Sequence, residues 1–394
     1  MATLPSPSVT EETLQGCKYF RVLGPLFAPL RTASTERDRA GNRQLFYDQY
    51  ASLMLLYFFH PVVTRVRGLP QTTRLPKVQE RLGVRRTSLG ALSDAAYVFD
   101  AALLHEVLTT LGAQLRPHLP LAEQEALAQW TAVDGSLLPA LPRMAWALWQ
   151  DDQHRAAKMP VAVAVLRQGP VDVTGTAGNG SERAAGRRLV QPGGCSVVER
   201  GSVDYRLLQA LHDLPCSVLC RVKDTAAYEV QEEHALSPAA VQAGVVHETV
   251  LRRLGTLHHT RGLPQPFRMV RVATGTMRKD GTPDVVVLVT HRLDLDAELM
   301  AVAYRYRWAV ELLFRWVTCV LGCRHVLSQG INGVRMQVYA ALIARLLISL
   351  WVERAPTKRT YEMLCFSLSG WATEAAWIAH IDRLHLKAPP PCKN

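Results

Sequence analysis

The sequence ELMAVAYRYRWAVELLFRWVTCVL, which runs from Glu298 to Leu321, decides the fold of this chain. Its apolar residues recur at spacings of three and four with no proline or glycine among them, which predicts one long helix. Tyr304, Arg307 and Glu311 are three and then four residues apart, so a helix presents them on one face. Such a helix is rigid and therefore holds the Glu311 carboxylate at a fixed position. The simpler interpretation is an ion pair between Arg307 and Glu311 on a surface helix.

The composition indicates a folded, basic protein with more than one domain. The chain has 394 residues, of which 48% are hydrophobic, and a formal net charge of +11. A chain of this length can bury a substantial core and is expected to form two or three domains. The positive charge favours a polyanionic partner, with nucleic acid the first candidate and an anionic membrane surface the second.

Signals for export or for a membrane span are weak. Residues 1–16, MATLPSPSVTEETLQG, lack the basic and then apolar order of a signal peptide. The most apolar run, 338–352, is too short to span a bilayer and contains Arg345, so we expect a buried helix there. The eight cysteines include no CxxC pair, which favours reduced thiols. We therefore expect a cytoplasmic protein.

The N-terminal part of the chain, residues 1–125, reads as a helical domain that binds DNA. The segment from Gln44 to Phe59 is dense in leucine, tyrosine and phenylalanine, which predicts a core helix. Seven basic residues follow within 64–86 against one acid, Glu80. Such a block attracts phosphates, and a solvated basic face is the equal alternative. The basic residues are Arg65, Arg67, Arg74, Lys77, Arg81, Arg85 and Arg86.

This basic block also has the outline of a helix-turn-helix. Pro76–Leu82 predicts a short helix and Gly83–Arg86 a turn, and Thr87 is expected to cap a second helix that runs through Ala101. A third helix is expected at 102–115. Two helices joined by a short turn can place one of them in the major groove of DNA.

From Trp130 onward the periodicity changes from that of helices to that of strands. The first strand, WTAVDGSLL, carries Asp134. Three strands, a helix, a strand, a helix and a strand are predicted in that order, which is the ribonuclease H-like arrangement. In that arrangement the first and fourth strands lie side by side, so acids on them can share metal ions. The predicted elements are 130–138, 161–166, 170–176, 181–189, 195–200, 203–212 and 217–222.

Residues 226–282 interrupt this scheme. Their dispersed valines and the turn Lys279-Asp280-Gly281 predict a mostly β insertion, after which the apolar strand 283–290 leads into the long helix. The expected fold class is therefore α/β, a ribonuclease H-like mixed sheet flanked by helices, with a β insertion and an all-helical N-terminal domain. The expected domains are 1–125, a catalytic core in two parts at 126–225 and 283–355, the insertion at 226–282, and a C-terminal segment at 356–394.

These residues resemble the DDE transposases of bacterial insertion sequences, in particular the insertion-sequence-four-like group. The signature of that group is Tyr-x2-Arg-x3-Glu-x6-Lys, which reads Tyr304, Arg307, Glu311 and Thr318 here. The first acid of the group lies in a V-D-G-T/S context, and this chain has VDGS around Asp134. The flanking sequences WALWQDDQHRAAK, TAGNGSE and LGCRHVLSQ agree as well, so the similarity covers most of the chain.

The resemblance implies a metal-dependent endonuclease and strand transferase. Asp134, Glu199 and Glu311 would be the catalytic acids and would hold two Mg²⁺ or Mn²⁺ ions. Arg307 would contact a DNA phosphate with support from Tyr304. The partner would be double-stranded DNA, both the terminal inverted repeats and the target, bound by a homodimer in a paired-end complex. A bacterial host and association with the nucleoid are also implied.

Two positions depart from the pattern of the group. Glu199 stands where the second acid is normally aspartate, and its extra methylene moves the carboxylate by about 1.5 Å, a displacement that can cost about a hundredfold in rate. Thr318 stands where the group has lysine and offers a phosphate only a hydroxyl. We expect both changes to lower the activity. Two other functions stay open: an impaired or co-opted transposase that mainly binds DNA, and a structure-selective nuclease of ribonuclease H-like fold.

The same helix carries two tryptophans that could stack on a base flipped out of the DNA. Trp308 and Trp316 both fall within the amphipathic pattern, so we expect a core role for each.

Overall fold

The computed structural model describes two compact units, each built from separate stretches of the chain. We call 1–116, 138–157 and 315–389 the helical unit, and 117–137, 158–314 and 390–394 the sheet unit. The five domains expected from the sequence stay a prediction. The described residues are 19–60, 63, 65–117, 121–139, 144, 146–147, 156–167, 169–174, 176–177, 193–198, 208, 216–255, 263, 265–278, 281–323 and 326–385.

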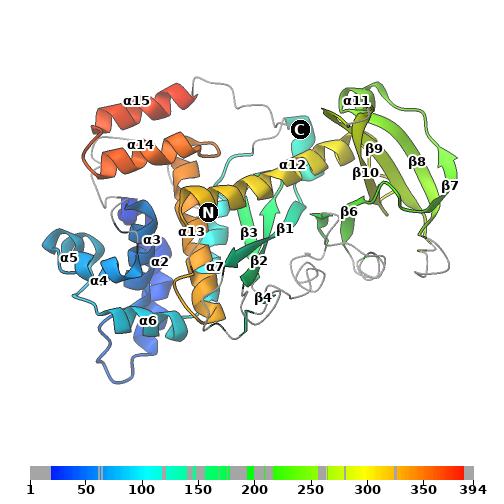
Figure 1. The fold of residues 1–394 in the computed structure, drawn as a ribbon. Coiled ribbons are helices and arrows are strands. Elements are labelled where there is room, and N and C mark those ends of the chain that lie inside the picture. The colour runs from blue at the N-terminus through cyan, green and yellow to red at the C-terminus, as the bar shows by residue number, and fades with distance from the viewer. Residues whose placement is uncertain are drawn as a thin grey trace. The chain divides into compact units, whose positions relative to one another are not determined.

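The helical unit is arranged around one long apolar helix, α13, against which α3, α6, α7 and α15 pack (Figure 1). Its core is dominated by leucine, alanine and valine side chains from these helices. Their bounds are α2 Tyr19–Glu36, α3 Tyr47–Phe59, α4 Leu69–Thr72, α5 Pro76–Leu82, α6 Leu89–Val98, α7 Ala101–Gly112, α13 Ile331–Val352, α14 Lys358–Leu368 and α15 Glu374–His385, with a 3-10 turn at Val66–Gly68.

Helix α13 is long and apolar enough to cross a membrane by length and composition, yet 89% of its most apolar stretch is buried inside the protein. The expectation of a buried core helix is therefore confirmed. Burial lowers the pKa of Arg345, in the middle of this helix, to about 10.

Helix α13 begins at a close contact with the joint between α6 and α7. Asn332 donates from Nδ2 to the carbonyl oxygens of Ala96 and Phe99, at 3.0 and 2.7 Å, and its Oδ1 accepts from the Ala101 amide at 3.2 Å. One side chain thus satisfies the carboxyl end of α6 and the amino end of α7, where backbone groups have no partner within the helix.

We expect Asn332→Ala to lower the free energy of unfolding by about 1–3 kcal/mol, because it leaves part-buried backbone groups without these hydrogen bonds. Thermal and urea unfolding followed by circular dichroism measure this change. Asn332→Asp is the matched variant: it keeps the acceptor for Ala101 but turns a carboxylate oxygen toward the Ala96 and Phe99 carbonyl oxygens, so its stability should be no higher than that of Asn332→Ala. An unchanged stability of Asn332→Ala would contradict the role of this side chain.

The sheet unit contains a mixed sheet that extends from β3 to β7 (Figure 1). The strand order is β3-β2-β1-β5-β6-β10-β9-β8-β7, with β4 beside β2. Strands β1, β5 and β6 are parallel, and β10 is antiparallel to β6. The bounds are β1 Trp130–Pro139, β2 Ala156–Ala164, β3 Gly169–Val173, β4 Thr176–Ala177, β5 Cys195–Val198, β6 Ser217–Val222, β7 Tyr228–Glu233, β8 Val245–Leu254, β9 Phe267–Met277 and β10 Pro283–Thr290.

Strands form within residues 226–282, where a mostly β insertion is expected, and they continue the same sheet. Strands β7, β8 and β9, with the short helix α11 Pro238–Gln242, join the core through β10, which pairs with both β6 and β9. A buried ion pair between Glu248 of β8 and Arg268 of β9 lies inside this part, and Nδ1 of His234 is 3.5 Å from the same carboxylate. Burial of a charged pair is tolerated because each charge has a partner. The short helix α8, Leu121–Leu127, precedes β1.

The long helix expected at 298–321 is shorter than predicted. Helix α12 covers Ala297–Arg315, and a π-helical segment follows at Trp316–Val320. The Leu321 amide donates to the Trp316 carbonyl at 3.1 Å, a bond that spans five residues. A π turn shifts the later side chains around the helix axis relative to a regular α-helix. The C-cap of the segment is Leu321, and Gly322 follows it with a φ of 69°, which is left-handed and suits glycine.

The cysteines within the described residues are free thiols, namely Cys195, Cys216, Cys220, Cys319, Cys323 and Cys365. Burial raises the pKa of the Cys220 and Cys323 thiols to about 12. Thiols with so high a pKa are poor nucleophiles at neutral pH, so these two are structural.

Candidate functional site

The first acid of the site is placed by the parallel pairing of β1 with β5. The register pairs Val133 with Val198, and Asp134 follows Val133 on β1. The side chain of Asp134 is 23% exposed, so its carboxylate is part-buried at the surface of the sheet. The predicted adjacency of the first and fourth strands is confirmed by this pairing. Glu199, the expected second acid, lies outside the described residues.

The second described acid comes from α12, and an arginine joins it to the first. Arg307 donates from Nη2 to Oε1 of Glu311 at 2.7 Å, and its Nη1 is 3.4 Å from Oδ2 of Asp134. Asp134 and Glu311 therefore meet at one guanidinium, although they come from a strand and a helix far apart in sequence. The prediction that the helix delivers a carboxylate to one point agrees with this geometry.

Arg307 is buried, with 5% of its side chain exposed, whereas Glu311 is 36% exposed. The expected ion pair between the two is present, but the interpretation of an exposed surface pair is wrong for Arg307. An arginine can form paired, planar hydrogen bonds with carboxylates, which makes it suited to a buried position between two of them. The guanidinium also lies 5.4 Å from the ring centre of Tyr304, within the range of a cation–π contact.

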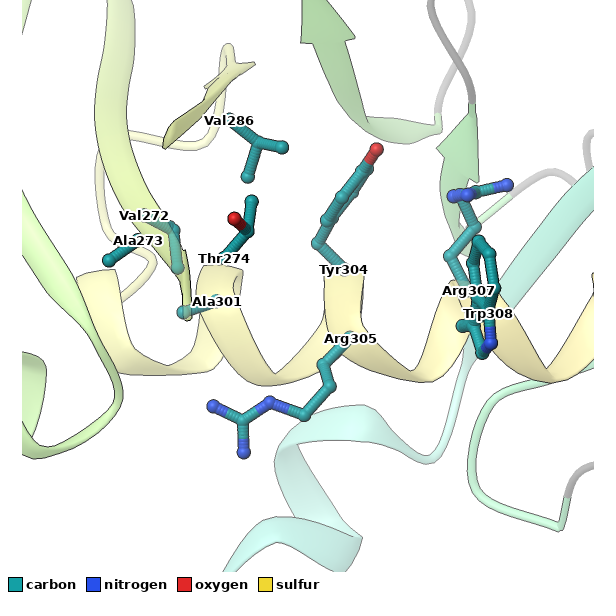
Figure 2. Close-up of a pocket in the computed structure, with 9 residues that line it drawn as sticks. All are labelled: Val272, Ala273, Thr274, Val286, Ala301, Tyr304, Arg305, Arg307 and Trp308. Atoms are coloured by element: carbon teal, nitrogen blue, oxygen red, sulfur yellow. The ribbon is translucent and has the colours of Figure 1, made fainter. Parts of the chain in front are cut away.

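A pocket of about 100 Å³ opens beside this cluster, between α12 and the strands β9 and β10. Figure 2 shows Tyr304 and Arg307 on one side of α12 and Arg305 on the opposite side. Apolar side chains from both strands form much of the wall. The lining residues are Val272, Ala273, Thr274, Val286, Ala301, Tyr304, Arg305, Arg307 and Trp308.

The strands that line this pocket were not part of the site expected from the sequence. Val272 and Val286 resemble any buried strand residue, so nothing in their sequence context marks them. Arg305 was missed as well, although its position two residues before Arg307 places it on the other side of a helix. Arg305 donates from Nη2 to the carbonyl of Ala243 at 3.2 Å and so ties α12 to the end of α11.

The two tryptophans of this helix differ. Trp316 is buried and meets the ring of Tyr361 edge to face at 5.9 Å, which confirms its core role. Trp308 is 47% exposed, so a core role is wrong for it. Thr318 lies half-buried within the π-helical segment, where the regular spacing from Glu311 no longer holds.

The basic residues expected to bind DNA lie on the helical unit. The described side chains among them are exposed, and they are Arg65, Arg67, Arg74, Lys77, Arg85 and Arg86. The side chain of Arg81 lies outside the described part of the structure. Helix α5 has the predicted bounds. Helix α6 begins after its cap, Ser88, instead of after Thr87, and it ends at Val98 instead of running through Ala101, which is the first residue of α7.

A buried contact brings two parts of this basic block together. Oγ1 of Thr73 accepts a hydrogen bond from the Thr87 amide at 3.0 Å, and both residues are almost fully buried. Arg74 follows the first threonine and Arg86 precedes the second. The contact therefore holds the backbone that precedes α5 against the backbone that follows it.

The carboxylates suit a divalent metal. Within the described residues no group of three His, Cys, Asp or Glu side chains is assembled. Asp134 and Glu311 nevertheless direct carboxylate oxygens at one cationic group, the Arg307 guanidinium. Oxygen ligands of this kind are those that Mg²⁺ and Mn²⁺ prefer, so these two residues fit such an ion.

The chain is similar to known transposases. The family described as the transposase DDE domain matches residues 126–347. A putative transposase from Sinorhizobium fredii is 26% identical over 260 residues, which are 66% of this chain and 70% of that protein. A probable transposase for insertion sequence element IS5377 from Geobacillus stearothermophilus is 25% identical over 224 residues, 57% of this chain and 56% of the relative.

A solved structure, the piggyBac transposase synaptic complex with hairpin DNA, aligns with 98% of this chain and 83% of that chain at 11% identity, with a TM-score of 0.39. The matched family covers more than half of the sequence, including both described acids. The chain belongs to the transposase DDE domain family.

Proposed function

We propose that this protein cuts transposon ends and joins the freed 3′-hydroxyl to target DNA by two-metal-ion phosphoryl transfer, as a member of the insertion-sequence-four-like group. One observation carries the proposal: Asp134 of β1 and Glu311 of α12 meet at the guanidinium of Arg307. The strand order β3-β2-β1-β5-β6, with β1, β5 and β6 parallel, supports a ribonuclease H-like core.

In this proposal Asp134, Glu199 and Glu311 hold the metal ions. Val198, which precedes Glu199 in the sequence, pairs with Val133, which precedes Asp134, and this register supports the inclusion of Glu199. Two Mg²⁺ or Mn²⁺ ions, when bound, supply an activated oxygen nucleophile and neutralise charge on the leaving oxygen. Glu199 and Thr318 depart from the group, and we propose that they lower the rate without changing the reaction.

The other site residues bind and position the DNA. Arg307 supplies the cation for a backbone phosphate, with Tyr304 against its guanidinium. Thr318 contributes a hydroxyl at most. The exposed arginines and lysine near α5 bind the terminal inverted repeats or the target, and a homodimer in a paired-end complex holds two ends. We place this activity in the bacterial cytoplasm, at the nucleoid.

The basic block predicts a specific salt dependence. The double change Arg85→Gln and Arg86→Gln should weaken binding to duplex DNA and lower the slope of log K against log salt by about 0.9 for each phosphate that is no longer neutralised. Fluorescence anisotropy at a series of salt concentrations measures this slope. Arg252→Gln, which changes an exposed arginine on β8, is the control and should leave it unchanged. Equal slopes for the double variant and the wild type would show that these two arginines contact no phosphate and that the basic block is a solvated face.

One assay tests the proposed function. Labelled transposon-end DNA is incubated with the full chain and Mg²⁺ or Mn²⁺, with a chelator as control. Specific, metal-dependent cleavage at the end followed by strand joining is the expected result. Cleavage of unrelated branched or hybrid substrates in preference to ends would instead identify a structure-selective nuclease.

The second alternative, an impaired or co-opted transposase that mainly binds DNA, rests on the two departures from the group. It predicts tight binding of the ends without cleavage, and recovery of cleavage in the double variant Glu199→Asp with Thr318→Lys. Cleavage by the wild-type chain at a rate close to that of this double variant would exclude it.

A further inference from the structure

One buried cation holds both described acids of the site. The guanidinium of Arg307 is 2.7 Å from Glu311 and 3.4 Å from Asp134, while only 5% of the arginine side chain is exposed. The two carboxylates are more exposed, at 36% and 23%, so solvent and ions reach them more easily than they reach the arginine.

Two carboxylates that face one point repel each other unless a positive charge lies between them. Arg307 supplies that charge with one planar group that addresses both acids. A divalent metal bound by the same oxygen atoms would supply it as well. The guanidinium and the metal would then bind the same carboxylates, so binding of one would weaken binding of the other.

We propose that Arg307 competes with divalent metal ions for Asp134 and Glu311, and so sets how tightly the chain binds metal in the absence of DNA. This inference rests on the proposed function, in which these two carboxylates hold metal. When metal binds the carboxylates, the guanidinium can bind a DNA phosphate instead, because phosphate, like carboxylate, forms strong hydrogen bonds with arginine. Tyr304, whose ring centre lies 5.4 Å from the guanidinium, is its aromatic neighbour on the same helix.

The competition is a coupling between two sites, and such a coupling acts in both directions. Metal that occupies the carboxylates releases Arg307 to the phosphate, and a phosphate that engages Arg307 releases the carboxylates to the metal. Arg307 is thus a positioning residue for the metal as well as a contact for DNA.

The test measures metal binding without DNA and without turnover. Mn²⁺ is titrated into the full chain by isothermal calorimetry at neutral pH, for the wild type and for Arg307→Gln. We expect Arg307→Gln to bind Mn²⁺ roughly tenfold more tightly, within the usual range of coupling between sites. The control is Arg252→Gln, because Arg252 is an exposed arginine on β8 that faces Glu229 outside the site; its affinity should equal that of the wild type.

Arg307→Lys guards against a loss of folding in the glutamine variant, which circular dichroism detects. Lysine keeps the charge but has a single ammonium group in place of the fork, so its Mn²⁺ affinity should lie between those of the wild type and Arg307→Gln. Equal or weaker Mn²⁺ binding in both folded variants, compared with the wild type, would overturn the inference and show that Arg307 organises the carboxylates for metal.

Glu311→Gln separates this inference from the proposed function. Full Mn²⁺ binding by Glu311→Gln would mean that the metal site is elsewhere, and both proposals would fail. Loss of Mn²⁺ binding in Glu311→Gln, together with an unchanged affinity in Arg307→Gln, would overturn only the competition.

Discussion

Asp134→Ala and Glu311→Ala should each lower the rate of transposon-end cleavage by at least about a thousandfold, the scale expected when one member of a set of residues that act as a unit is removed. Each change deletes one of the two carboxylates that meet at Arg307. In the proposed reaction a metal ion would then lose a charged oxygen ligand and the nucleophile would lose its position, and a misplacement of 1 Å can cost about a hundredfold.

The measurement is single-turnover cleavage of a labelled end at saturating protein, so that weaker binding does not enter the rate. Asp134→Asn and Glu311→Gln keep the shape of each side chain and should be nearly as inactive, because they lose the charge. Glu298→Gln, in the first turn of the same helix, is the control and should cut like the wild type. Normal cleavage by both alanine variants would show that the reaction uses other residues.

Gly333→Ala should lower the free energy of unfolding of the helical unit by about 1–3 kcal/mol, the usual cost of an overpacked core. A Cβ atom at Gly333 would lie 2.5 Å from Cβ of Ser328 and 3.0 Å from Cβ of Ala96. Neither neighbour is the end of a flexible side chain, so backbone must move. Alanine normally gains about 0.5–1 kcal/mol over glycine inside a helix, and the contact outweighs this gain.

Gly90→Ala is the matched control for this substitution. Gly90 is also in the first turn of a helix, α6, and a Cβ there would meet only Oγ of Ser88, at 3.7 Å. This variant should be as stable as the wild type or slightly more stable. Thermal unfolding compares the two, with about 2–4 °C for each kcal/mol in a unit of this size. Equal melting temperatures for Gly333→Ala and Gly90→Ala would contradict the close packing of α13 against α6.

Local patterns predicted several elements at or near their observed bounds. Strands β6 and β10 and helix α5 agree residue for residue, because short apolar runs and proline or glycine at the ends define them locally. Strand β2 begins at Ala156, five residues before the predicted Val161. The alternation there is weak, so the sequence pattern does not mark where the strand begins.

The site was predicted in part. The spacing of Tyr304, Arg307 and Glu311 placed them on one face of a helix, as a helix of constant period requires. The burial of Arg307 was beyond such an argument, because it depends on Asp134 from a strand that is distant in sequence. The same limit applies to Thr318: the π-helical segment begins at the buried Trp316, and regular helical spacing does not anticipate it.

The place of β10 in the sheet also affects which changes can accumulate among copies of a transposable element that encodes such a chain. Strand β10 is hydrogen-bonded to β6 on one side and to β9 on the other, whereas, among the strands that the structure describes, β7 pairs only with β8. Changes of length at β7 affect only an outer edge, so drift among copies can accumulate there. A deletion that removed β10 would cut the sheet in two, and descendants that carried it would lose the strand that leads into the helix of Glu311.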